Sequence, residues 1–499
     1  MTDIRLAVIP YVERAYEFLC WALLAFFIFL GMSYTFLIPP FQVPDEQNHW
    51  EAAHQRINNL LPSHTTEDCS LFTALAPHFD AGILIFNPHI KQPTGKFEDL
   101  VNLKPNCTKN NVNYGTVLTY PGVILSRVLF LFSAITGPKA LQAFYLARLF
   151  QGLLITLLLG RWLWHAHQTG YPSGTLSLVA LCLSPIFAQQ SFGISADLVI
   201  NLFAISLAMT LVFWYRLTKV DLGILLGVGI CATTSKPIIV ALTAGALGLA
   251  CVAWIVPRSL PITTQSPLKK RRFWTLVSIL TGLVILGIWS GLSQSRVLKG
   301  SLIHPDVDAV KQLAHMMSHP VATVFTFVRT LRDASDPPLL FTYLGWLDVY
   351  VPGRWITRGL GLFKLLILLD LSRACFQWFF HRPRPPIPEV LRNSFLLGGS
   401  IAGFYMLNAV TLYLAWTPVG AAQVDGLQAR YFLPGLIFAC GFVPSCLQRG
   451  VALDVPQSMT IQSNSKPKPW ILRSLALIFA VYLLNYWTGL CQAVLTRYW

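Results

Sequence analysis

Two adjacent carboxylates, Asp45 and Glu46, follow an apolar run near the start of the chain, separated from it by Pro39 and Pro40. Proline ends a helix and stiffens the chain, so the pair is expected just outside the apolar segment. There it would open a short helix over Glu46–Asn58. A carboxylate held by a rigid turn can act as a general base, or bind a divalent cation such as Mg²⁺ or Mn²⁺. The alternative role for Asp45 is an N-cap of the short helix.

Two cations stand at the ends of other apolar segments. Lys236 precedes Pro237 between two such segments, and Arg430 opens another, with Gln428 and Tyr431 as neighbours. A guanidinium matches phosphate oxygens through two parallel hydrogen bonds. We therefore interpret these residues as a phosphate-binding site. A snorkelling lysine and an arginine that only sets topology are the alternatives.

Further polar residues in the same kind of position widen the candidate site. Asp197 lies at the outer end of an apolar segment, where a carboxylate is either functional or a helix N-cap. Asp348 lies in an apolar, tryptophan-containing stretch, where it either orients another site residue or caps a loop. No spacing typical of a zinc site joins the histidines of these regions, which are His49, His54, His304 and His319.

The composition of the 499 residues excludes an ordinary soluble enzyme. Hydrophobic residues make up 54% of the chain and charged residues 12%, against about 25% charged in soluble domains. Several apolar runs have the length of about 20 residues that a helix needs to cross a bilayer. The net charge of +15 comes from Lys and Arg placed beside apolar segments. That placement favours the positive-inside rule and anionic lipid over nucleic acid.

Charge placement also predicts the topology of a single transmembrane domain over residues 1–499. The N-terminus is expected in the cytoplasm, with an uncleaved first span, and the C-terminus outside. We expect eleven spans, at 17–38, 141–163, 172–191, 195–215, 221–236, 237–256, 273–293, 355–379, 392–415, 430–447 and 470–492. Segment 116–135 is also apolar, but counting it as a span would put the basic cluster 269–272 outside. It is therefore predicted as a helix in the outer interface.

This topology leaves three outer loops, at about 39–140, 294–354 and 416–429. They hold most of the acidic residues and histidines, which indicates that the outer face is the working face. Cys69 and Cys107 lie in the first loop, and a disulfide between them stays open as an alternative.

Four stretches together resemble one family. The pattern P-P-F-x-x-P-D-E-x-x-H-aromatic at Pro39–Trp50 resembles the DUF2142 family of bacterial membrane proteins. These are similar in turn to the GT-C superfamily of glycosyltransferases that use polyprenyl-phosphate sugars. The other three stretches are Ser195–Asp197, Leu344–Asp348 with Pro352, and Gly426–Pro434.

The resemblance implies an all-α, GT-C-like bundle of about eleven transmembrane helices, with juxtamembrane helices in the large outer loops. It implies an enzyme of the bacterial inner membrane with its site facing the periplasm. This enzyme would transfer a monosaccharide, with inversion, from a polyprenyl-phosphate donor to a surface glycan or a lipid-linked acceptor. Asp45 would be the base and Glu46 its orienting partner or an alternative base. The substrate-binding residues would be His49, Asp197, Lys236, Asp348, Gln428, Arg430 and Tyr431.

Two other functions stay open. A transporter or flippase of lipid-linked sugars would carry polar residues at mid-membrane, often in repeated halves. The candidate ionisable residues of this chain lie instead at the predicted membrane boundary, and we find no internal repeat. A noncatalytic subunit of envelope polysaccharide assembly would tolerate substitution of Asp45 and Arg430.

Overall fold

The computed structural model groups the chain into two compact units. Unit 1 comprises Met1–Leu198, Phe341–Arg382 and Gln448–Trp499, and unit 2 comprises Val199–Leu340 and Pro383–Leu447. Each unit is described by itself. The residues that the structure describes are 2–50, 52–53, 119–129, 137–169, 171–213, 216–255, 267–295, 306–336, 338–345, 349–380, 387–446 and 469–499.

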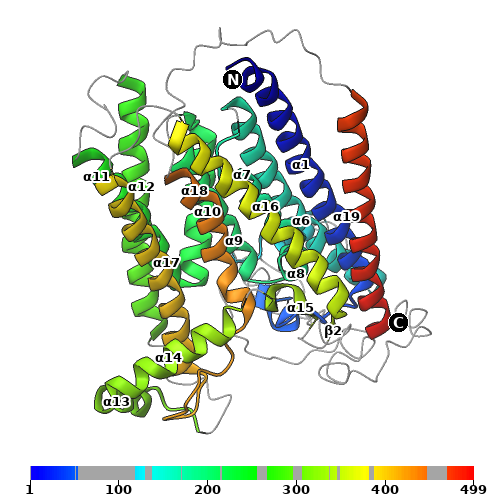
Figure 1. The fold of residues 1–499 in the computed structure, drawn as a ribbon. Helices are drawn as coiled ribbons and strands as arrows, with labels where there is room; N and C mark the ends of the chain where they lie inside the picture. Colours follow the sequence, from blue (N-terminus) through cyan, green and yellow to red (C-terminus); the bar gives the residue numbers. More distant parts are fainter. Residues whose placement is uncertain are drawn as a thin grey trace. The chain divides into compact units, whose positions relative to one another are not determined.

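Unit 1 is built around its first helix. α1 (Thr2–Leu37) packs against five other elements of the unit, and α19, in red, runs beside it in Figure 1. A two-stranded antiparallel hairpin pairs β1 with β2. The remaining elements of the unit are α5 (Pro121–Leu129), α6 (Gly137–Gln168), α7 (Thr175–Ala180), η4 (Leu181–Leu183), α8 (Pro185–Phe192), β1 (Tyr343–Leu344), β2 (Val349–Tyr350), α16 (Gly353–Phe380) and α19 (Pro469–Tyr498).

Unit 2 is organised around α17 (Ile387–Ala415), which packs against α11, α13, α14 and α18. Two elements cross the boundary between the units, α9 (Asp197–Val212) and α15 (Leu339–Thr342). The other elements are α10 (Lys219–Ser235), η6 (Pro237–Ile239), α11 (Val240–Ile255), α12 (Pro267–Ser295), α13 (Ala309–Ser318), α14 (Pro320–Ala334), η9 (Ala429–Phe432) and α18 (Leu433–Cys446).

Every predicted span contains helix, but eleven membrane-crossing helices are not confirmed. Within the described residues, five helices are long and apolar enough to cross: Glu13–Leu37, Leu141–Gln168, Arg271–Leu292, Val390–Ala415 and Arg473–Tyr498. α16, which contains the predicted span 355–379, is not among them, because Lys364, Asp370 and Arg373 interrupt its apolar sequence.

The predicted span 172–191 is bent in the structure. It forms two helical segments, Thr175–Leu183 and Pro185–Phe192, bent by 83°. Ser184 between them has an extended backbone, and Pro185 starts the second helix because its ring clashes with the preceding turn. The pair is a broken span or a re-entrant segment, and it would be the sixth candidate if it crosses.

Segment 116–135 is described only at residues 119–129, which contain one helix, α5. α5 has 9 residues, against the roughly 20 that a crossing needs. Its axis comes close to α6 because Gly122 has no side chain. A Cβ there would overlap Gln151 and lie 2.5 Å from the carbonyl oxygen of Ala147.

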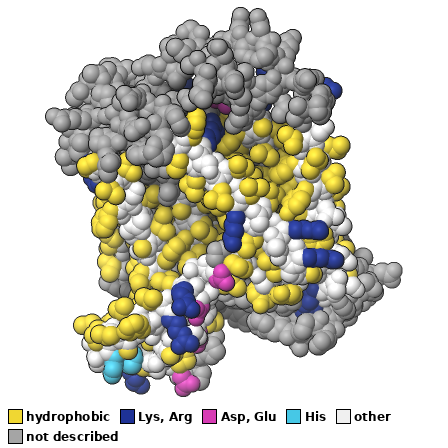
Figure 2. Space-filling model, in the orientation of Figure 1, with side chains coloured by type: hydrophobic (Ala, Val, Ile, Leu, Met, Phe, Trp, Pro, Cys, Tyr) yellow, Lys and Arg dark blue, Asp and Glu magenta, His cyan; other side chains and the backbone are white. Residues whose placement is uncertain are grey.

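α13 and α14 expose their apolar side chains and bury polar ones. Gln312 accepts a hydrogen bond from the Gly420 amide (2.9 Å), and Thr330 accepts one from the Val424 amide (3.0 Å). Figure 2 shows the outward apolar surface of this helix pair, formed by Val310, Leu313, Met317, Val321, Val324, Phe325 and Val328. Such inverted amphipathicity is typical of helices that lie in a membrane interface, as expected for the second outer loop.

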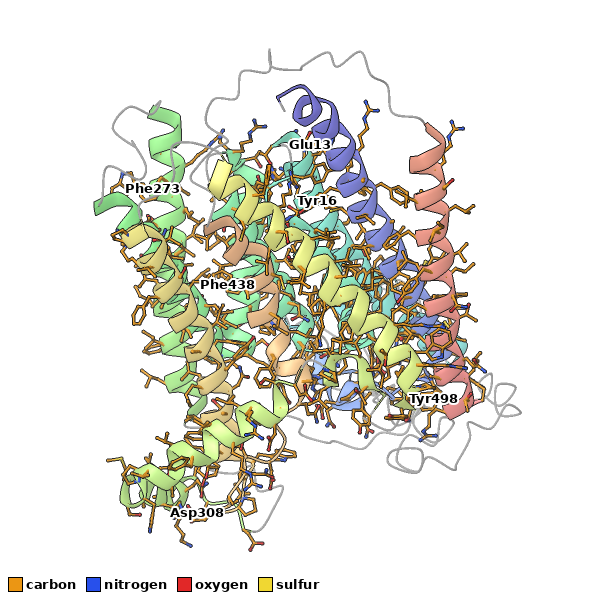
Figure 3. All side chains as sticks on the ribbon, viewed as in Figure 1. Glu13, Tyr16, Phe273, Asp308, Phe438 and Tyr498 are labelled. Carbon is orange, nitrogen blue, oxygen red and sulfur yellow. The ribbon has the colours of Figure 1, made fainter. Side chains whose placement is uncertain are left out.

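The first turn of α13 is capped by Asp308, labelled in Figure 3. Its carboxylate accepts hydrogen bonds from the amides of Val310 and Lys311, both at 3.0 Å. The Lys311 amide is the main reason that the pKa of Asp308 is lowered. The helix α13 therefore begins at a defined residue.

Candidate functional site

The two adjacent carboxylates occupy different environments. Glu46 is fully buried, and each of its oxygens accepts two hydrogen bonds. Oε1 accepts from Arg148 Nε (2.8 Å) and the Ile194 amide (3.0 Å). Oε2 accepts from Arg148 Nη2 (2.6 Å) and the Phe41 amide (3.0 Å). The carboxylate of Glu46 is therefore committed to holding the structure together.

Arg148, on α6, completes this network. Besides its two bonds to Glu46, its guanidinium donates to the carbonyl oxygens of Thr35 (2.9 Å), Ile38 (2.7 Å) and Pro39 (3.1 Å). A guanidinium has five N–H donors. The five hydrogen bonds of Arg148 therefore give each of these donors an acceptor. The last carbonyl groups of a helix lack hydrogen-bond donors within that helix. At the end of α1, Arg148 provides the donors. We call these contacts the Glu46–Arg148 network.

Residues 38–45 form the loop that this network closes, and we call them the Asp45 loop. The backbone of this loop is strained. Phe41 and Asp45 have φ angles of 67° and 61°, in the left-handed region that residues other than glycine rarely adopt. Phe41 and Trp50 pack edge-on against the Phe144 ring, with centroid distances of 5.0 and 5.1 Å. Strain of this kind persists only where the surroundings over-determine the backbone, and it clusters at functional sites.

Asp45 is the more accessible of the two carboxylates. Its side chain is partly exposed, and its carbonyl oxygen accepts the His49 amide at 2.9 Å. The helix that follows starts at Glu46, with residues 46–50 and 52–53 helical. The left-handed φ of Asp45 differs from the extended backbone of an ordinary N-cap. The loop thus holds Asp45 rigidly while leaving its side chain partly open.

Two other segments of unit 1 contact this loop or the helix that follows it. His49 is buried, and its Nδ1 lies 2.7 Å from the hydroxyl of Tyr120. Tyr120 is the residue before α5. The turn between α8 and α9 bonds Glu46 through Ile194. A Cβ on Gly193 of that turn would lie 2.8 Å from Val43.

Asp197 opens α9 directly after the same turn. Its side chain is buried, and its amide donates to Ser195 Oγ at 3.1 Å. The turn therefore places Asp197 a few residues along the chain from Ile194, whose amide bonds Glu46.

The hairpin of β1 and β2 is attached to α8. Gln189 and the backbone of Gly345 form a reciprocal pair of hydrogen bonds at 3.2 and 3.3 Å. Gly345 has a φ of 62°, which glycine adopts without strain. Asp348 lies outside the described residues, so its predicted role stays a prediction.

In unit 2 the predicted cations meet on one aromatic ring. Lys236 Nζ lies 4.8 Å from the centroid of the Tyr431 ring, and Arg430 Cζ lies 5.2 Å from it. Arg430 is buried, and its Nη2 donates to the Tyr431 hydroxyl at 3.3 Å. The Tyr431 ring thus brings together two cations that are far apart in the sequence. Gln428 contributes a buried Oε1 that has no hydrogen-bond partner among the described residues.

The profile of the DUF2142 family, described as "predicted membrane protein", matches residues 26–439. The chain belongs to the DUF2142 family. Together with the apolar helices, this establishes an all-α, multi-pass membrane protein. No curated protein and no solved structure matches the chain. Both the Asp45 loop and the cation cluster of this DUF2142 protein, which comprises Lys236, Gln428, Arg430 and Tyr431, lie within the matched region.

Glu46 of this DUF2142 protein does not fit as a ligand of the divalent cation considered at the acidic pair. Mg²⁺ and Mn²⁺ need free carboxylate oxygens, but both oxygens of Glu46 already bind the Arg148 guanidinium. Nor is a group of three or more His, Cys, Asp or Glu that could hold a metal found among the described residues. We therefore derive no step through a metal. The same bonds leave Glu46 unsuited to the alternative role of base.

Three residues of this DUF2142 protein were missed by sequence reasoning. Arg148 and Asp370 each lie inside a predicted span, and an ionisable residue there is itself a signal. Asp370 accepts bonds from Tyr16 Oη, Ser177 Oγ and the amides of Ser177 and Gly174, at 2.7–2.9 Å. Gln42 lies beside the acidic pair, and its buried amide group has no partner among the described residues. A buried amide without a partner is a candidate for contact with a ligand.

Proposed function

We propose that this DUF2142 protein is a membrane glycosyltransferase. It transfers a monosaccharide from a polyprenyl-phosphate donor to a hydroxyl of a surface glycan or lipid-linked acceptor. The single observation that supports the proposal is that two adjacent carboxylates, Asp45 and Glu46, lie in different environments. Glu46 is closed by four hydrogen bonds, whereas Asp45 is held in a strained, partly exposed position. A scaffold needs only the first of these features.

In the proposed reaction, Asp45 is the catalytic base. Its carboxylate takes the proton of the acceptor hydroxyl while that oxygen forms a bond to the anomeric carbon of the donor. The bond between the anomeric carbon and the phosphate oxygen breaks, and its electron pair leaves with the polyprenyl phosphate. Glu46 is a positioning residue, because it acts on Asp45 only through the backbone of the loop. Inversion of the anomeric centre follows from the resemblance to GT-C enzymes.

Lys236 and Arg430 are proposed to bind the phosphate of the donor. Two like charges over one ring repel each other, and a doubly charged leaving group offsets that repulsion. Fixed cations that meet developing charge lower the barrier without a metal. The proposed location is the bacterial inner membrane, with the site facing the periplasm.

The same observations support a transporter or flippase less well. A lipid-linked sugar moving through the protein would need polar groups along a path at the membrane midplane. Asp45 and Arg430 instead follow or precede apolar helices.

Surface-glycan composition and linkage analysis in the native host tests the proposal. Four strains are compared at equal protein level: wild type, gene deletion, and the deletion complemented with Asp45→Asn or with Asp336→Asn. Asp336 is an exposed aspartate of unit 2 and serves as the matched control. We expect one sugar branch to be lost in the deletion and the Asp45→Asn strains, and restored by Asp336→Asn. A wild-type glycan with Asp45→Asn would contradict the proposal.

A further inference from the structure

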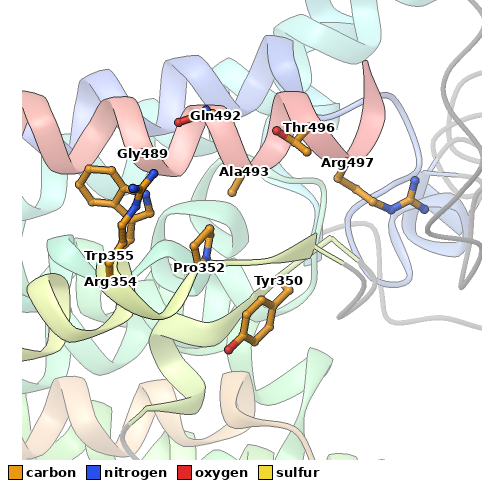
Figure 4. A pocket seen from close by; sticks show the side chains of 9 residues that line it. All are labelled: Tyr350, Pro352, Arg354, Trp355, Gly489, Gln492, Ala493, Thr496 and Arg497. Carbon is orange, nitrogen blue, oxygen red and sulfur yellow. The ribbon is translucent and has the colours of Figure 1, made fainter.

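A pocket of about 310 Å³ lies in unit 1 between the start of α16 and the end of α19. None of its lining residues belongs to the Asp45 loop, and α19 lies beyond the part of the chain that the family matches. Figure 4 shows the side chains that line it, which are Tyr350, Pro352, Arg354, Trp355, Gly489, Gln492, Ala493, Thr496 and Arg497.

One side of this pocket is closely packed. The indole of Trp355 is buried and lies against Gly489, where a Cβ would overlap the ring. Two guanidinium groups stack on the same indole, Arg354 at 5.1 Å and Arg358 at 4.6 Å from the ring centroid. Arg358 is oriented further by a 2.6 Å hydrogen bond to Asn485.

Positive charge dominates the lining. Arg354 and Arg497 lie at opposite ends of the row of lining residues in Figure 4. None of the described lining residues is acidic, and α19 contains no Asp or Glu. Arg354 is exposed and forms no ion pair with any described residue. In the predicted topology these helix ends lie outside, where the positive-inside rule does not call for cations.

The remaining lining groups suit an oxygen-rich ligand. Tyr350, Gln492 and Thr496 offer a phenol, an amide and a hydroxyl between the two arginines. Arginine favours phosphate oxygens, and clustered basic side chains attract anionic lipid headgroups. We propose that this pocket binds a phosphate-bearing anion, supplied either by a lipid headgroup or by free phosphate. The proposal does not depend on the transfer reaction.

Native mass spectrometry of the purified full chain tests this site. The protein is equilibrated with phosphatidylglycerol, or with phosphatidylcholine of the same acyl chains, with and without inorganic phosphate. We expect phosphatidylglycerol to bind at least 10-fold more tightly than phosphatidylcholine. Arg354→Gln should reduce that affinity about 10-fold, and the double variant with Arg497→Gln should reduce it further. Arg332→Gln, on α14, is the control and should bind like wild type.

Competition identifies the source of the anion. If millimolar inorganic phosphate displaces phosphatidylglycerol, the pocket recognises the phosphate itself; if it does not, the lipid is the ligand. Because Arg497 is buried, the melting curve of each variant is measured, and the exposed Arg354→Gln carries the test if the double variant misfolds. Equal affinity for the two lipids, or wild-type affinity of Arg354→Gln, would overturn the proposal. Loss of transfer with unchanged lipid binding would affect only the proposed function.

Discussion

The Glu46–Arg148 network in unit 1 and the cation cluster in unit 2 use charge in opposite ways. In the first, opposite charges are buried together, and every donor and acceptor of the pair has a partner. In the second, two like charges share one aromatic ring, and a buried Gln428 oxygen lacks a described partner. A closed, neutral network holds a backbone in place, whereas converging like charges are suited to an anionic ligand. Burial of a charged residue therefore does not by itself show whether its role is structural or functional.

Removing Arg148 should cause the largest change. Arg148→Met leaves Glu46 buried without its counter-charge, and breaking a buried pair in this way costs about 3–5 kcal/mol. Chemical denaturation of the detergent-solubilised protein measures the loss in unfolding free energy. Arg332→Met, whose side chain is 87% exposed, should change it little. A loss below about 1 kcal/mol for Arg148→Met would mean that the network does not hold the loop.

Arg430→Gln tests the other side of the comparison. It removes a charged hydrogen-bond donor worth about 1.5–3 kcal/mol, so the KM for the donor should rise about 10- to 100-fold. The melting temperature should change less than with Arg148→Met. Steady-state transfer kinetics over a range of donor concentrations give this value. An unchanged KM would remove Arg430 from the donor site.

Gly122→Ala should have an intermediate effect on unit 1. The added methyl group overlaps Gln151 and crowds the carbonyl of Ala147, and such overpacking costs about 1–3 kcal/mol. Gly160→Ala on α6 is the matched control, because a Cβ there meets no neighbouring atom within 4 Å. Thermal unfolding of the two variants measures the difference. Equal melting temperatures would show that α5 does not pack closely on α6.

Tyr431→Phe should have the smallest effect. It keeps the ring on which both cations lie and removes only the hydroxyl that accepts the 3.3 Å bond from Arg430. A hydrogen bond of this kind contributes about 0.5–1.5 kcal/mol, so the donor KM should rise about 2- to 10-fold. Tyr431→Leu, which removes the ring as well, should raise it more. Equal effects of the two variants would mean that the ring does not orient the cations.

Local sequence was sufficient for the helices and for the family. Long apolar runs and the motif around Asp45 predict a helical membrane protein of the DUF2142 family, and both are confirmed. The bend at Ser184 was missed, although Pro185 is a local signal for it. Apolar composition alone does not distinguish a straight span from a bent pair, because both bury the same residues.

Long-range partners could not be predicted from the sequence. Glu46 and Arg148 are 102 positions apart, and the sequence around either residue does not indicate that the other is its partner. The sequence indicated Lys236 and Arg430 as candidates. It did not predict that both cations lie close to the same tyrosine ring. Which of two adjacent carboxylates is buried was equally hidden, because it depends on where α6 lies.

Asp45→Asn and Glu46→Gln, measured side by side, test the central claim most directly. For each variant the melting temperature is compared with the ability to restore the glycan of the deletion strain, normalised to folded protein in the membrane. We expect Asp45→Asn to melt like wild type and to lose transfer by about 10²- to 10⁴-fold. Glu46→Gln should lower the melting temperature while its folded fraction keeps measurable transfer. Wild-type transfer by Asp45→Asn would contradict the account, because the partly exposed carboxylate would then have no role in the reaction.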